Sequence, residues 1–127
     1  MKLNSVLTLL FIALFTACKG GAYDLSGYGL KPDTGENASP LIAKALQEIA
    51  AEVNFDTVRI LLPKGRYDFY PEGASKREYF ISNHDQDNPK TVGFPLEDWK
   101  GLTVDGQGAD FIFHGRMLPL SLLRSED

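Results

Sequence analysis

The spacing of hydrophobic residues changes once along the chain, near residue 55. Before that point, apolar residues recur every three or four positions, as on one face of a helix, at Ile42, Leu46, Ile49 and Val53. Ser39 and Pro40 give a start signal, because serine is a common N-cap and proline fits the first helical turn. The pattern therefore predicts one amphipathic helix that begins at Ser39, ends near Asn54 and covers an apolar surface.

After the helix the chain has short runs of β-branched and aromatic residues, separated by Gly, Pro, Asp and Asn. We expect strands over residues 57–62, 66–70, 79–82, 91–94, 102–104 and 110–114, followed by an apolar stretch over 118–123. Before the helix, residues 19–22 are expected to form a short tether and residues 27–37 a loop. The chain is therefore predicted to be mainly β.

The spacing of the expected strands suggests a repeat. Ile60, Ile81 and Thr103 lie 21 and 22 residues apart, each in a short β run. Repeats of about 20 to 50 residues with short strands are typical of solenoids. We predict the first coils of a parallel β-helix, about three of them, with the helix capping the open end, which would otherwise expose an unpaired strand edge. A β-sandwich is the alternative, since short strands and frequent turns suit it too.

The N-terminus has the features of an export signal. Met1 and Lys2 precede a predominantly apolar run of ten residues over 6–15, which is too short to span a bilayer, since that takes about 20. Small residues then lead into Cys18, the only cysteine of the chain, so neither an internal disulfide nor a multi-cysteine zinc site is expected. The segment resembles the lipobox of bacterial lipoproteins, although Phe15 departs from the leucine common there.

We therefore expect lipidation at Cys18, export, and a lipid anchor in a bacterial membrane, on the periplasmic or the cell-surface side. An ordinary secretory signal, in which Cys18 is incidental, is the alternative. The predicted organisation is a signal peptide over 1–17, a tether and opening loop over 18–37, and the cap helix with the first coils over 38–127.

Composition and charge narrow the classes of function. The chain has 127 residues, 43% hydrophobic and 24% charged, as in a folded domain. Its 13 Lys and Arg against 17 Asp and Glu give a net charge of −4, which disfavours nucleic-acid binding. Neither a GxGxxG nor a GxxxxGK[ST] motif occurs, so a nucleotide site has no support, and no cofactor is predicted. The sequence does not indicate an oligomeric state.

Two turn motifs resemble those of a known fold. A strand at 58–60 leads into Pro63-Lys64-Gly65-Arg66-Tyr67, and the stretch 102–109, LTVDGQGA, closes into an Asp-Gly-x-Gly turn. Both are similar to signatures of pectate-lyase-like right-handed β-helices. They indicate the fold and say little about the reaction.

The stretches 79–89 and 110–119 resemble the N-terminal part of family 110 glycoside hydrolases. These are inverting exo-α-galactosidases that remove terminal α-1,3-linked galactose, as on blood-group B glycans. The resemblance runs from about Tyr23 to Arg124 and covers about the first fifth of such an enzyme. It implies a galactose-terminated glycan as substrate and catalytic carboxylates in later coils. We therefore expect a truncated N-terminal part, with little activity alone, and assign no catalytic residue.

Asn83, His84 and Asp85 form a polar cluster where an expected strand enters a loop, and we predict that they bind substrate, since their groups suit sugar hydroxyls. Turn capping by Asn83 and Asp85 is the alternative. His114 is expected to pack against the next coil. His84 with two nearby aspartates is too few ligands to predict a metal site.

Several carboxylates are candidates for hydrolysis by residue type only: Asp85, Asp87, Glu97, Asp98, Asp105 and Asp110. Asp105 is assigned to turn formation. Trp99 could stack on a sugar ring, but core packing is the more common role of such a residue. Two alternatives to a galactosidase remain: a non-catalytic surface lipoprotein that binds glycan or a partner protein through a short β-helix, and a β-helix polysaccharide lyase.

Overall fold

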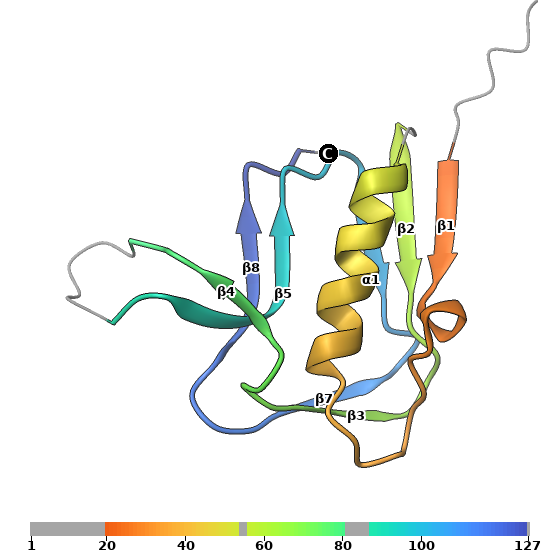
Figure 1. Cartoon of the computed structure of the whole chain (residues 1–127). Coiled ribbons are helices and arrows are strands. Elements are labelled where there is room, and N and C mark those ends of the chain that lie inside the picture. Colours follow the sequence, from red (N-terminus) through yellow and green to blue (C-terminus); the bar gives the residue numbers. More distant parts are fainter. Residues whose placement is uncertain (1–19, 54–55, 81–86, 127) are drawn as a thin grey trace, which may run out of the picture.

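The computed structural model describes residues 20–53, 56–80 and 87–126 (Figure 1). In chain order its elements are β1 (Gly20–Asp24), a 3-10 helix (Leu25–Tyr28), α1 (Ser39–Glu52), β2 (Thr57–Leu61), β3 (Arg66–Phe69), β4 (Ser75–Arg77), β5 (Lys90–Glu97), β6 (Leu102–Asp105), β7 (Asp110–Phe113) and β8 (Leu118–Leu123). The predicted helix is confirmed and begins at Ser39. Its N-cap, however, is Ala38, one residue before the predicted N-cap Ser39.

The strands form two turns that lie side by side. β2, β3 and β5 make the first turn, and β6, β7 and β8 follow the same path beside it, each in parallel with its counterpart (Figure 1). β1 pairs in parallel with the other edge of β2, and β4 pairs antiparallel with β5. The fold is thus mainly β, with small parallel sheets and one helix in its described part, as predicted at that level.

The predicted repeat of 21 to 22 residues is wrong. Ile60 neighbours Val104 directly, 44 positions along the chain, whereas Val92 neighbours Leu118, only 26 positions along. The difference arises because the hairpin of β4 and β5 is inserted between β3 and the second half of β5. Ile81 lies outside the described residues. The structure therefore has two stacked turns after the helix, where the spacing predicts three.

The expected strand at 79–82 is not found in its described part. Tyr79 and Phe80 belong to no strand, and 92% of Phe80 is exposed. The strand of this region is instead β4, three polar residues that pair with the start of β5. The aromatic and β-branched residues at 79–81 lead to the wrong strand prediction. The strands of the inserted hairpin pair through their backbones and do not need an apolar face.

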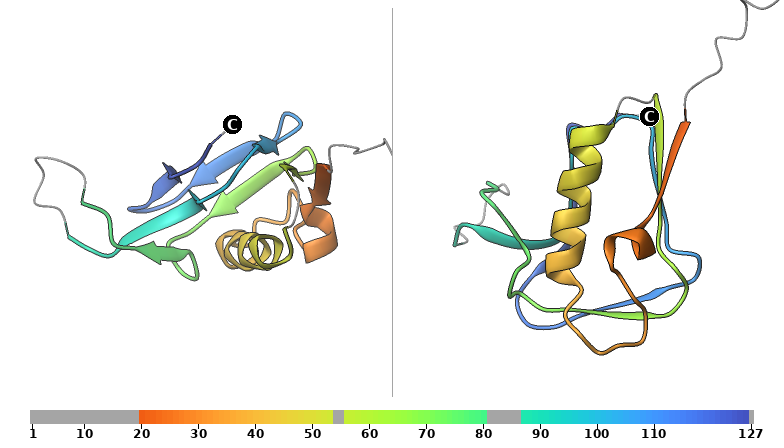
Figure 2. Two further views of the ribbon diagram at one scale, coloured as in Figure 1. Left: turned by 90° about the horizontal axis from the view of Figure 1, so that it is seen from above. Right: turned by 45° about the vertical axis from the view of Figure 1, so that its right-hand side comes forward.

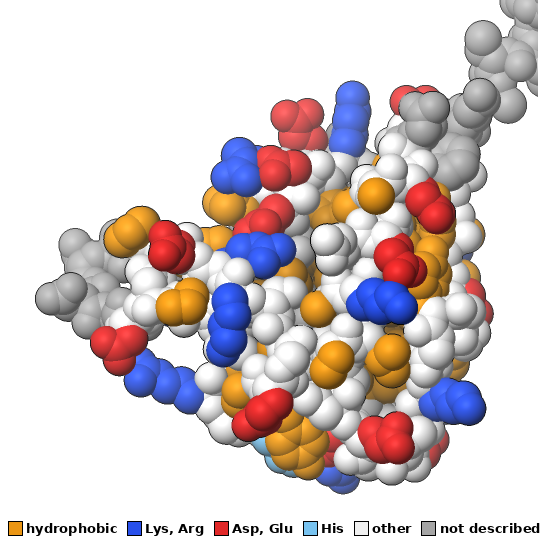
Figure 3. Space-filling view, viewed as in Figure 1, with side chains coloured by type: hydrophobic (Ala, Val, Ile, Leu, Met, Phe, Trp, Pro, Cys, Tyr) orange, Lys and Arg blue, Asp and Glu red, His pale blue; other side chains and the backbone are white. Residues whose placement is uncertain are grey.

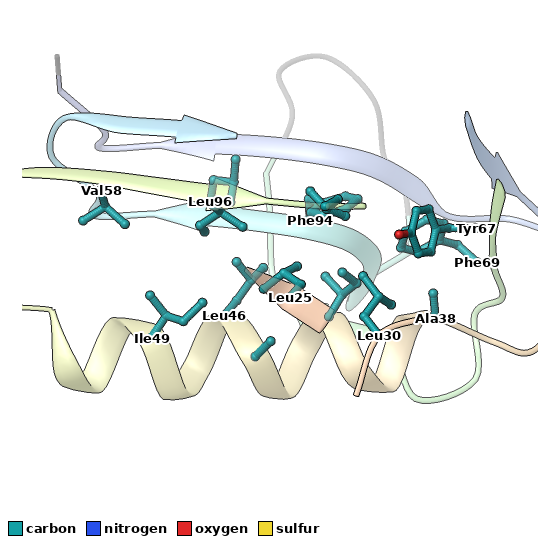
Figure 4. Close-up of a cluster of buried hydrophobic side chains, with 14 of the residues drawn as sticks. Leu25, Leu30, Ala38, Leu46, Ile49, Val58, Tyr67, Phe69, Phe94 and Leu96 are labelled. Atoms are coloured by element: carbon teal, nitrogen blue, oxygen red, sulfur yellow. The ribbon is translucent and has the colours of Figure 1, made fainter. Parts of the chain in front are cut away.

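The core lies between α1 and the first turn (Figure 4). The buried face of the helix consists of Ile42, Ala45, Leu46 and Ile49. It meets Val58 and Ile60 of β2 and the buried part of β5. In the left view of Figure 2, α1 lies on one side of β2 and β5, while β6 and β8 lie on the other. The helix thus covers the side of the first turn that the second turn leaves open.

Asn37 ties the start of α1 to the end of β3. Its side-chain oxygen accepts hydrogen bonds from the backbone N–H groups of Ser39 and Tyr70, both at 3.0 Å. The Ser39 hydroxyl donates to the carbonyl of Tyr70 at 2.7 Å. The bond from Ser39 satisfies an N–H group that the helix itself leaves unpaired, and the other two bonds tie this end of the helix to Tyr70. Asn37 therefore fixes the position of α1 relative to the end of β3, although it lies outside the helix.

The Pro63–Tyr67 turn has a clear physical basis. The Tyr67 hydroxyl donates to the Pro63 carbonyl at 2.6 Å, which closes the turn. Gly65 has a φ of +145°, and a Cβ there would lie 2.4 Å from Cβ of Pro32. Only glycine fits this position. In the other turn, Asp105 accepts from the backbone N–H of Gln107 at 2.9 Å, which confirms its predicted turn role.

Residues 20–22, expected to be part of a tether, belong to β1. This strand places Tyr23 opposite Ile60, where Tyr23 packs against the core. The strand is not predicted from the sequence because Gly20 and Gly21 have low strand propensity. It forms because β2 supplies its hydrogen-bond partners. Cys18, the predicted lipidation site, lies outside the described residues. Among the described helices, none has the length and apolar character needed to cross a bilayer.

Candidate functional site

The predicted substrate-binding residues Asn83, His84 and Asp85 lie outside the described residues, between β4 and β5 in the chain. The residues before and after this segment, up to 80 and from 87, are described. The backbone N–H of Tyr79 donates to the side-chain oxygen of Asn88 at 3.2 Å, which brings the two ends together. The predicted role of the three residues stays a prediction. Across the described residues, no three His, Cys, Asp or Glu side chains converge in a way that would hold a metal ion.

A polar network anchors the base of this hairpin to both turns. The Tyr79 hydroxyl donates to one carboxylate oxygen of Glu97 and shares a hydrogen bond of 2.9 Å with the Ser121 hydroxyl. Arg77 Nε donates to the other Glu97 oxygen at 3.0 Å. The network therefore joins β4, β5 and β8 through one carboxylate.

Glu97 is ionised in this network. Burial raises the pKa of Glu97, but the hydrogen bonds from Tyr79 and Arg77 outweigh it and leave the pKa below its ordinary value. Burial and the bond to Glu97 raise the pKa of Tyr79, so its hydroxyl keeps its proton. Glu97 is thus a hydrogen-bond acceptor, without a proton to donate.

A second cluster is centred on Asp68 of β3, whose side chain is 7% exposed. Arg66 donates to its two carboxylate oxygens at 2.8 and 3.1 Å, and His114 Nε2 lies 2.8 Å from one of them. Because a carboxylate only accepts, Nε2 of His114 carries the hydrogen. The His114 ring stacks on Tyr70, with 4.2 Å between centroids. His114 thus packs against the preceding turn, whereas the sequence predicts the following one.

The bonds from Arg66, then from His114, lower the pKa of Asp68 to about 2. Asp33, Gly35, Arg66, Tyr70 and His114 surround it in an open hollow of about 390 Å³. Asp68 is not among the candidate site residues predicted from the sequence. The alternating pattern of residues 66–70 does place this carboxylate on the face opposite Tyr67 and Phe69, and that position could have indicated it. The cluster joins the two turns and holds its carboxylate ionised.

Two other candidate carboxylates, Asp98 and Asp105, have similar partners. Asp98 accepts from Arg124 at 2.6 and 2.9 Å, and Asp105 pairs with Arg59. These hydrogen bonds lower the pKa of both groups. Asp87 lies 3.9 Å from Arg116 in full exposure to solvent, and Asp110 is an exposed residue at the start of β7.

A glycosidase needs a carboxylic acid whose raised pKa lets it protonate the leaving oxygen. Five described carboxyl groups have shifted pKa values, and all five are lowered: Asp24, Asp68, Glu97, Asp98 and Asp105. Trp99, the candidate for sugar stacking, is 7% exposed and belongs to the core. The described geometry supports binding and scaffolding, and none of these five groups suits the role of general acid.

The sequence is similar to those of several curated proteins named α-1,3-galactosidase. One from Phocaeicola vulgatus, named α-1,3-galactosidase B, is 65% identical over 98% of this chain and 20% of its own length. Another of that name, from Parabacteroides distasonis, is 50% identical over 94% of this chain and 20% of its own length. A protein from Shewanella woodyi named α-1,3-galactosidase A is 40% identical over 80% of this chain and 16% of its own length.

No family model matches the chain. The chain spans about a fifth of the length of the curated relatives from Phocaeicola and Parabacteroides. At 65% identity over almost the whole chain, the similarity confirms the resemblance predicted from the sequence. The chain is therefore a homologue of the α-1,3-galactosidases, over a segment that makes up about one fifth of their length.

Proposed function

We propose that this chain forms the N-terminal part of an α-1,3-galactosidase, in which it builds the cap and first coils of a right-handed parallel β-helix. The observation that carries the proposal is the 65% identity, over 98% of the chain, to a relative named α-1,3-galactosidase B. The parallel pairing of β2 with β6, β3 with β7 and β5 with β8 supports the β-helix, as does the position of α1 beside the first turn.

The outer side of the second turn is suited to receive another coil. β6, β7 and β8 each have a neighbour on one edge only among the described strands. Val104 of β6 and Leu120 and Leu122 of β8 line one open hollow and are 37%, 47% and 65% exposed. Parallel strands are rarely left uncovered, because unpaired edges and apolar side chains favour association. A third coil, paired in parallel with β6, β7 and β8, would cover these residues.

In this proposal the substrate is a glycan that ends in α-1,3-linked galactose. Inverting hydrolysis uses one carboxylic acid to protonate the leaving oxygen and one carboxylate to activate water, roughly 6.5 to 9.5 Å apart. We assign both to parts of the longer protein. The Glu97 and Asp68 networks then serve to hold the first two turns together, because both carboxylates are ionised and hydrogen-bonded to side chains from other parts of the chain.

The test is galactose release by the longer protein. An α-1,3-galactosyl disaccharide is incubated with the purified protein, and proton NMR follows the anomeric signals. The proposal predicts free galactose that appears first as the β-anomer, and no release from the α-1,4-linked isomer. A folded protein that releases no galactose from the α-1,3-linked disaccharide would contradict it.

We also propose that Cys18 is lipidated and anchors the protein to a membrane. A single cysteine directly after a short apolar run and small residues supports this. Several acyl chains would give stable attachment, since each buried methylene adds about 0.8 kcal/mol. Wild type should fractionate with membranes and carry the added acyl mass, and Cys18→Ser should lose both. Equal fractionation of the two proteins would refute the anchor.

The role of Asn83, His84 and Asp85 in substrate binding is part of the same proposal. His84→Ala in the longer protein should raise KM with a smaller effect on kcat, because a lost ground-state hydrogen bond weakens binding. An unchanged KM would remove these residues from the site.

A further inference from the structure

A hollow of about 530 Å³ lies between α1 and the strands β4 and β5, within the range typical of ligand pockets. Helix residues form one wall, and the strands and the residues after β5 form the other. Its polar lining consists of Lys44, Gln47, Ser75, Arg77, Glu97 and Asp98. Neither the predicted loop residues nor the proposed hydrolysis accounts for this hollow, which we call the helix groove.

The helix groove contains polar groups that are already held in place. Arg77 and Glu97 are joined at 3.0 Å, and the Tyr79 hydroxyl also donates a hydrogen bond to Glu97. Each Glu97 oxygen uses one acceptor position in these bonds and keeps another for a ligand hydroxyl. On the opposite wall, Gln47 is exposed on α1 and offers both an amide donor and an acceptor. Groups fixed in advance lose little entropy on binding.

The charges of the helix groove balance. Lys44 and Arg77 contribute two positive charges, and Glu97 and Asp98 contribute two negative ones. On the face seen in Figure 3, acidic and basic side chains lie next to one another, without a broad patch of one sign. A lining of this kind gives no electrostatic preference for an anion or a cation. It favours a neutral ligand with many hydroxyl groups.

The remaining lining is apolar: Ala43, Leu46, Ala50, Pro95 and Trp99. Such a surface suits the carbon face of a sugar ring, while the hydroxyls reach Gln47 and the Arg77–Glu97 pair. We propose that the helix groove binds a neutral hexopyranose unit of a glycan, as a second carbohydrate site. This proposal goes beyond hydrolysis, since the site belongs to the segment itself and needs no catalytic acid.

Trp99 makes the proposal testable in the full chain, because it is the only tryptophan and lines the helix groove. Titration with α-1,3-galactobiose should give a saturable change in tryptophan emission. Galacturonate, which carries a carboxylate, should bind several-fold more weakly. Gln47→Ala should weaken galactobiose binding about fivefold, the effect of one lost hydrogen bond.

Glu52→Ala is the matched control, because Glu52 is an exposed residue of α1 that does not line the helix groove. It should bind galactobiose as wild type does. Circular dichroism shows whether each variant is folded, and Gln47 is exposed, so folding should be retained. The absence of a saturable change in wild type, or equal affinity of Gln47→Ala and Glu52→Ala, would overturn the proposal. Neither result bears on galactose release by the longer protein, so the two proposals fail separately.

Discussion

Gly93 of β5 lies where the first turn packs closely on the second. A Cβ at this position would be 2.8 Å from a ring carbon of Phe113 and 2.8 Å from the backbone carbonyl oxygen of Pro119. The Pro119 oxygen belongs to β8, which β5 holds by hydrogen bonds, so it cannot move without disturbing the pairing. The φ of Gly93 is not in the left-handed region, so the clash alone determines the effect.

We expect Gly93→Ala to lower the free energy of unfolding by about 1 to 3 kcal/mol, the usual cost of overpacking. For a domain of this size, each kcal/mol corresponds to about 4 to 8 °C in Tm. Gly106→Ala is the matched control. Its Cβ would meet its nearest neighbour, Phe111, at 3.7 Å, an ordinary contact, and its φ is also outside the left-handed region. Thermal unfolding followed by circular dichroism measures both variants.

The control should be unchanged or slightly more stable, because alanine restricts the unfolded chain more than glycine. A Gly93→Ala protein as stable as Gly106→Ala would refute the close packing of β5 on β8 that this reasoning uses. Equal and large destabilisation of both variants would also count against it, since the control position has room for a methyl group.

Three further substitutions test other parts of the fold. Ile49→Ala removes a side chain of α1 that is 0% exposed and should lower the free energy of unfolding, measured in urea, by about 2 to 5 kcal/mol. Lys44→Ala, whose side chain is 72% exposed, should change that free energy by less than about 0.5 kcal/mol. Gly65→Ala should destabilise the chain more than Gly106→Ala, because its φ is +145° and its Cβ would overlap Pro32; equal urea midpoints would contradict this. Because the pKa of Asp68 falls from 3.8 to about 2 on folding, its contribution is complete above about pH 4 and is lost as the pH falls toward 2. Asp68→Asn should therefore show a shallower loss of stability between pH 4 and 2, and an unchanged slope would exclude this role.

The sequence predicts α1 well, because its apolar spacing, its proline and its length all favour a helix. β2, β3, β6, β7 and the middle of β5 are also predicted, since each contains a short apolar or alternating run between turn residues, whereas β8 is expected only as an apolar stretch. β1 and β4 are missed for one reason. Both are rich in glycine or polar residues, and they are strands because β2 and β5 supply their partners.

The predicted repeat length is wrong because residue spacing alone does not show that a hairpin is inserted in the first turn. The insertion makes the spacing from Ile60 to Val104 44 residues, about twice the expected 21 to 22. It therefore mimics an additional coil. The Asp68 and Glu97 clusters also escape prediction, since His114 lies 46 residues from Asp68, and Arg77 and Tyr79 lie 20 and 18 residues from Glu97. Motif reasoning does better for Gly65 and Tyr67, whose contacts are within one turn or with the loop beside it.

The most direct test of the central claim is to sequence the coding DNA through and beyond the codon for Asp127. The account predicts an open frame that continues for several hundred codons and encodes further β-helix coils, similar to the remaining four fifths of the α-1,3-galactosidase relatives. A stop codon directly after Asp127 would contradict it, because this chain would then lack the coils to which we assign the catalytic carboxylates.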